Sequence, residues 1–95
     1  MSMEKEIRYT VPFSPLEERI AREMPHLSGA LAELRSFMGT NDFEKYINSL
    51  VSLRKVGDQV LLITKREMFR SILVSRFLPA IKKSFDVEFV RIINQ

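Results

Sequence analysis

The sequence predicts a small α+β domain in which helices pack on one three-stranded sheet. Its first half shows helical spacing of apolar residues, two short β-prone runs flank Gly57-Asp58, and a β-branched run ends the chain. The 95 residues are 45% hydrophobic and 28% charged, as is usual for one globular domain. The predicted order is helix, helix, strand, strand, helix, strand over residues 26–95, after an amino-terminal extension over residues 1–25.

The extension begins with an alternating stretch over residues 7–13, which is typical of a half-buried strand. Because Pro12 cannot donate a ladder hydrogen bond, we expect an edge strand or an extended arm. Ser14 followed by Glu17 three residues later predicts a helix that starts with a reciprocal side-chain cap, and Pro25 ends it. A helix of about ten residues is unstable alone, so we expect it to dock on the domain or on a second copy.

Two further helices are predicted next, on either side of Gly39, which suits a helix end. The first has a stripe at Leu27, Leu31, Leu34 and Met38. Thr40 or Asn41 is predicted to cap the second, which has a stripe at Phe43, Tyr46, Ile47 and Leu50. Both stripes are expected to face the core.

The second half of the chain shows a different spacing of apolar residues. Residues 50–56 and 59–64 are β-prone, and the Gly57-Asp58 pair between them predicts a tight hairpin. Residues 65–77 predict a helix that packs on two sides, which Pro79 kinks or restarts as a short turn through Phe85. Residues 86–93 predict the third strand.

The composition argues against an enzyme and predicts no cofactor or metal. The chain has no cysteine, and its single histidine, His26, has no partner ligands at metal-binding spacing. Its glycines are isolated, so no phosphate-binding loop is present, and no acid/base pair stands out. The longest apolar run is Val60–Ile63, and the first residues lack the apolar core of a secretion signal. We therefore expect a cytoplasmic protein with no membrane association.

Positive charge gathers in the last third of the chain. Residues 60–95 hold seven basic and three acidic side chains, a net charge of +4. One hypothesis is therefore a small basic module that binds single-stranded nucleic acid weakly and in a salt-sensitive way. Its candidate contacts are Arg66, Arg70, Arg76, Lys82 and Lys83. The chain has no Gly-x-x-Gly loop of the kind that tight KH-type binding uses.

A set of apolar motifs occurs in a recognisable order. The motifs are Leu31-x-x-Leu34, Phe43-x-x-Tyr46-Ile47-x-x-Leu50, the Gly57-Asp58 hairpin, Leu61-x-Ile63, Arg76-Phe77-Leu78-Pro79-x-Ile81 and Val87-x-Phe89. Over about residues 26–93 the chain resembles the amino-terminal domain of the bacterial chromosomal replication initiator DnaA, or a stand-alone relative of it. The resemblance implies a KH-like fold and a non-catalytic interaction module in DNA replication initiation. It also implies self-association and contact with the replicative helicase or an initiation regulator.

The resemblance assigns partner-binding roles by position. Asp42 matches an acidic position of the family that contacts the helicase, and Met68 or Phe69 matches an exposed aromatic position. Leu27 stands where the family often has an aromatic residue used in self-association, although Leu27 also suits a core position. Tyr46 replaces a common tryptophan. A carboxy-terminal domain of a clamp-loader tau-like subunit has a similar pattern, but the Arg76–Ile81 stretch favours the initiator.

Overall fold

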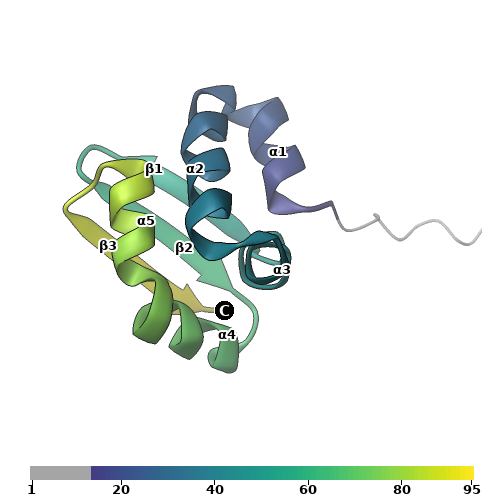
Figure 1. Cartoon of the computed structure of the whole chain (residues 1–95), viewed down its shortest axis with the longest axis vertical. Helices are drawn as coiled ribbons and strands as arrows, with labels where there is room; N and C mark the ends of the chain where they lie inside the picture. Colours follow the sequence, from purple (N-terminus) through teal and green to yellow (C-terminus); the bar gives the residue numbers. More distant parts are fainter. Residues whose placement is uncertain (1–13) are drawn as a thin grey trace, which may run out of the picture.

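The computed structural model describes residues 14–95 (Figure 1). Its amino-terminal half contains α1 (Leu16–Glu23), the 3-10 turn η2 (Pro25–Leu27), α2 (Ser28–Met38), α3 (Thr40–Asp42) and the π-helical turn η3 (Phe43–Ile47). Its second half contains β1 (Ser52–Val56), β2 (Gln59–Thr64), α4 (Glu67–Ile72), the π-helical turn η4 (Leu73–Phe77), α5 (Leu78–Phe85) and β3 (Phe89–Asn94). The strand predicted over residues 7–13 lies outside the described residues.

The three strands form one mixed sheet in the order β1-β2-β3. Strands β1 and β2 are antiparallel and joined by the predicted hairpin, whereas β2 and β3 are parallel. The segment α4–η4–α5 carries the chain back from the end of β2 to the start of β3. In Figure 1 the helices cover one face of this sheet. The arrangement confirms the predicted α+β class and is compatible with the KH-like prediction.

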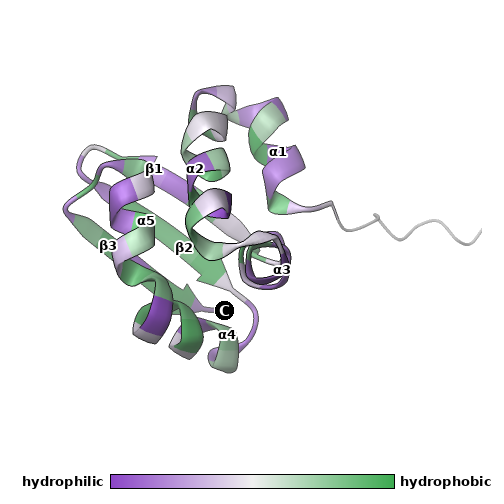
Figure 2. Ribbon diagram, viewed as in Figure 1, coloured by the Kyte–Doolittle hydropathy of each residue, from purple (hydrophilic) through white to green (hydrophobic). Residues whose placement is uncertain are grey.

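The alternation along β2 explains which side of the sheet is buried. Val60, Leu62 and Thr64 are buried, whereas Gln59, Leu61 and Ile63 between them are exposed or half-buried. Side chains on a strand alternate between faces, so the first set faces the helices and the second set faces away. Figure 2 shows that hydrophobic residues occupy much of β2 and β3.

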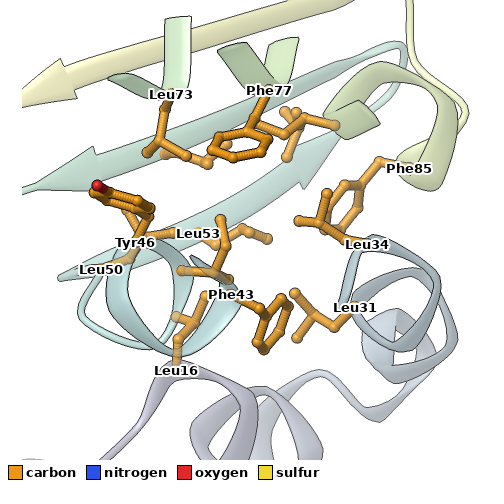
Figure 3. Packing of buried hydrophobic residues seen from close by; sticks show 14 of the residues in the cluster. Leu16, Leu31, Leu34, Phe43, Tyr46, Leu50, Leu53, Leu73, Phe77 and Phe85 are labelled. Atoms are coloured by element: carbon orange, nitrogen blue, oxygen red, sulfur yellow. The ribbon is translucent and has the colours of Figure 1, made fainter. Parts of the chain in front are cut away.

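The core lies between the sheet and the helices (Figure 3). Its fully buried members include Leu16, Ile20, Leu34, Phe43, Ile47, Leu50, Leu53, Val60, Leu62, Leu73 and Ile81. Leu16 and Ile20 of α1 are each only 1% exposed and belong to the same cluster as the rest. The first helix therefore docks on its own domain, which is one of the two arrangements expected from its short length.

The start of α1 differs from the sequence prediction. We expected Ser14 and Glu17 to form a reciprocal cap, and this is wrong because Pro15 occupies the cap position and no side chain of the segment caps it. Asn48 replaces that cap from the end of η3. Its side-chain Oδ1 accepts the Glu17 backbone N–H at 3.0 Å, and its backbone oxygen accepts the Leu16 N–H at 3.1 Å.

Asn48 also belongs to a polar network that joins three helical segments. Its Nδ2 donates to carboxylate oxygens of Glu17 at 3.3 Å and Glu44 at 3.2 Å. Arg35 of α2 donates to the same two carboxylates, at 2.6 Å and 3.1 Å. The hydrogen bonds from Asn48 and then Arg35 lower the pKa of Glu44. The carboxylate form of Glu44 is therefore favoured in the folded state.

Replacing Asn48 with alanine should destabilise the domain, because the side chain is buried and its loss leaves the Glu17 N–H without its acceptor. We expect the free energy of unfolding to fall by about 1–3 kcal/mol, measured by urea denaturation. Asn41→Ala is the matched control, since Asn41 is exposed and its side chain makes no hydrogen bond within residues 14–95. The predicted cap of α3 by Thr40 or Asn41 is wrong, because Gly39 occupies the cap position and no side chain caps that helix. Equal, small losses in both variants would contradict the capping role of Asn48.

The lowered pKa of Glu44 leads to another prediction, on how the stability of the domain depends on pH. Because its folded pKa lies below its unfolded pKa, Glu44 contributes stability above the unfolded pKa, and this contribution is lost as pH falls through the folded pKa. Glu44→Gln should therefore be less stable than the wild type at neutral pH, and the gap should narrow as the pH falls from about 4.3, the ordinary pKa of a glutamate, through the lower folded pKa. Urea midpoints measured from neutral to acid pH check this. A gap that stays constant with pH would show that the charge of Glu44 does not matter.

Candidate functional site

Three aromatic rings connect η3 with the helical segment that follows the hairpin. Tyr46 meets Phe69 edge to face, with ring centroids 5.0 Å apart and planes at 83°. Its ring also lies 6.3 Å from that of Phe77, and Figure 3 shows Tyr46 and Phe77 in the buried cluster. Such edge-to-face contacts are favourable beyond the area that they bury. We call Tyr46, Phe69 and Phe77 the aromatic seam.

Each ring of the aromatic seam carries a cation above it. Lys45 Nζ lies 5.4 Å from the centroid of Tyr46, and the guanidinium carbon of Arg66 lies 5.4 Å from that of Phe69. The guanidinium carbon of Arg76 lies 4.8 Å from the centroid of Phe77. Cations at these distances are attracted to the ring faces. The outer side of the seam is therefore positively charged and lies over two buried rings and the partly buried ring of Phe69.

Asp42 lies on the same seam. It stands one helical turn before Tyr46, and its Oδ2 is 3.7 Å from a terminal guanidinium nitrogen of Arg76 on η4. Both side chains are partly exposed, so this long ion pair adds little stability. The structure therefore places Asp42 at the surface, in a partly exposed ion pair with Arg76.

Met68 and Phe69 have different environments. Met68 is 68% exposed, whereas Phe69 packs partly buried against the core. Phe69 also lines a surface pocket of about 220 Å³ between the loop after η3, the end of β2 and the start of α4. Ser49, Thr64, Lys65 and Arg66 line the rest of this pocket. Of the two alternatives left open by the sequence, Met68 is the exposed apolar side chain.

Leu27 does not belong to this surface. It is the last residue of η2, and its side chain is 5% exposed and belongs to the core cluster. The sequence allowed either a core position or a self-association contact for this residue. Its burial leaves no exposed side chain for a partner to contact, so we do not include it in the site.

The basic residues proposed for nucleic-acid binding do not form one groove. Arg66 lies over Phe69 of the aromatic seam. Arg70 is directed to β3, where its Nε donates to the Ile92 carbonyl at 3.0 Å. Lys82 and Lys83 lie in the last turn of α5, and Lys83 Nζ is 5.4 Å from the centroid of Phe37 on α2. Arg66 and Arg70 thus lie near the start of the α4–η4–α5 segment, Arg76 lies in its middle, and Lys82 and Lys83 lie at its end.

No protein-family model, curated protein or solved structure matches this chain. The resemblance to DnaA thus stays a prediction from the residues quoted above. Within residues 14–95, no group of three or more His, Cys, Asp or Glu side chains could hold a metal ion. None of the helices in that range is long and apolar enough to cross a membrane.

The edge-to-face contact at the centre of the seam can be measured by a double-mutant cycle with Tyr46→Leu and Phe69→Leu. We expect a coupling of about 0.5–1.5 kcal/mol in the free energy of unfolding, obtained from urea denaturation of the four proteins. A cycle that pairs Tyr46→Leu with Phe37→Leu is the control, because Phe37 lies 46% exposed on α2 and no contact between these two rings is found. The same coupling in both cycles would argue against a specific ring contact.

Proposed function

We propose that this chain is a non-catalytic protein-interaction domain of bacterial DNA replication initiation, which binds the replicative helicase or an initiation regulator. The ordered apolar motifs that resemble the amino-terminal domain of DnaA support the proposal. Asp42, which the resemblance assigns to helicase contact, and Met68, at the position that it matches to an exposed aromatic, both flank the aromatic seam. They come from helical segments more than twenty residues apart in the sequence.

The exposed side chain of Met68 is the single observation that carries the proposal. A large apolar side chain that is 68% exposed, next to the ring-anchored Phe69, has the composition of an interface hot spot. Methionine is flexible and polarizable, so it adapts to a partner surface with little strain. Phe69 and Tyr46 hold the backbone beneath it, which lowers the entropy lost when a partner binds.

The charges around Met68 indicate what partner would fit. Lys45, Arg66 and Arg76 are exposed cations, and Asp42 is the acidic side chain paired with Arg76. A complementary partner would offer an apolar depression with acidic groups on its rim, and one basic group able to replace Arg76 at Asp42. Binding through such a surface should weaken as the salt concentration rises.

Two substitutions test the assignment. Met68→Ala and Asp42→Ala should each weaken binding to the replicative helicase about tenfold, because truncation of a hot-spot residue costs more than about 1 kcal/mol. Calorimetric titration gives the affinity, and melting curves should show each variant folded, since exposed positions contribute little to stability. Val56→Ala is the matched control, because Val56 is 72% exposed but lies on the hairpin.

Three outcomes would contradict the proposal. Unchanged affinity in both variants would show that the surface around Met68 and Asp42 is not the interface. A large fall in melting temperature would show that the residues serve the fold. Binding to a replicative polymerase subunit in place of the helicase would favour the clamp-loader tau-like alternative.

A further inference from the structure

The face of the sheet that points away from the helices is uncovered in the described part of the chain. The strand register places nine residues on it in three rows across β1, β2 and β3. The rows are Val56–Gln59–Phe89, Arg54–Leu61–Arg91 and Ser52–Ile63–Ile93. We call these nine residues the open sheet face.

Apolar groups are unusually frequent on the open sheet face. Five of its nine residues are apolar, and Phe89, Val56 and Ile93 are 59%, 72% and 37% exposed. The solvent side of an antiparallel or mixed sheet is normally polar, so this composition is unusual for a face that meets only water. An exposed apolar patch with polar neighbours is typical of a binding surface.

The charge on the open sheet face has one sign. Arg54 and Arg91 stand on either side of Leu61 in the middle row, and both are exposed. No acidic residue belongs to the face. Within residues 14–95 neither arginine forms an ion pair, since the pairs found there involve only Arg35, Arg70 and Arg76. The face is therefore complementary to an anionic ligand that also has flat apolar groups.

We propose that the open sheet face binds single-stranded nucleic acid, with Arg54 and Arg91 on phosphates and Phe89 stacked on a base. Guanidinium groups match phosphate oxygens in a planar, bidentate geometry. An exposed aromatic ring on a sheet surface is a platform for an unpaired base, and stacking tolerates any sequence. A second copy of this chain fits less well, because two such faces would bring arginines against arginines.

This site is distinct from the surface of the proposed function. The aromatic seam lies among helical segments on one side of the sheet, and the open sheet face lies on the other. It is also distinct from Lys82 and Lys83, which lie on α5. A protein partner and a nucleic-acid strand could thus occupy the domain together.

The test is fluorescence anisotropy of labelled oligonucleotides of about 20 residues, titrated with the full 95-residue protein. Oligothymidylate and oligouridylate should bind at low salt, better than a duplex of the same length. Phe89→Ala should weaken this binding at least about fivefold, the low end of the effect of one stacked base. Arg54→Ala combined with Arg91→Ala should lower the slope of log affinity against log salt by about 1.4, which corresponds to two lost phosphate contacts.

The matched control is Arg22→Ala combined with Lys65→Ala, which removes the same charge from α1 and from the loop after β2, both away from the open sheet face. This control should keep close to wild-type affinity, and melting curves confirm that all variants are folded. An equal loss in the control would overturn the proposal by showing that only net charge matters. So would equal duplex binding, no binding of single strands at about 50 mM salt, or a Phe89-dependent dimer seen by sedimentation.

Discussion

Asn48 is the residue on which the helical layer depends. Its amide group is buried, and its side chain and backbone together satisfy groups on Leu16, Glu17 and Glu44. A buried amide that loses its partners costs more free energy than the bonds contribute when they are made. These hydrogen bonds therefore fix the position of α1 against η3. Arg35 reinforces that placement because it spans the same two carboxylates from α2.

The two π-helical turns contribute to the aromatic seam. Tyr46 lies in η3 and Phe77 lies in η4, and these turns follow α3 and α4 directly. A π turn holds an extra residue within the helix, so the side chains after it rotate relative to a regular α-helix. The Asn48 backbone N–H, for example, donates to Phe43 O, five residues earlier, at 3.1 Å. Tyr46 lies within this turn. Asn48, which directly follows the turn, is thereby placed where it can cap α1.

Local patterns were sufficient to predict most of the elements. The leucine stripe predicted α2, the Gly57-Asp58 pair predicted the hairpin, and Pro79 predicted the restart of the helix at α5. The cap of α1 was mispredicted because a local Ser14 signal competes with Asn48, and a partner 31 residues away leaves no sequence signal.

The site was less predictable than the fold. Asp42 and Met68 came from a family resemblance, and their partner roles stay predictions. The contacts of Tyr46 with Phe69 and Phe77 depend on how separate helical segments meet, and so does the Asp42–Arg76 ion pair. No spacing within one helix reveals them. The open sheet face could not be predicted, because Val60–Ile63 is a continuous apolar run. The sequence therefore does not show which side chains point away from the helices.

The long-range cap of α1 also constrains the order in which the chain can fold during synthesis. Residues 16–23 are synthesised before Asn48, and until Asn48 and the later core residues follow, the helix has neither its cap nor the core that covers Leu16 and Ile20. A segment of eight residues does not hold a helix on its own in water. Helix α1 therefore forms only after the chain has been extended past η3, and the first helix in the sequence becomes a late one in folding.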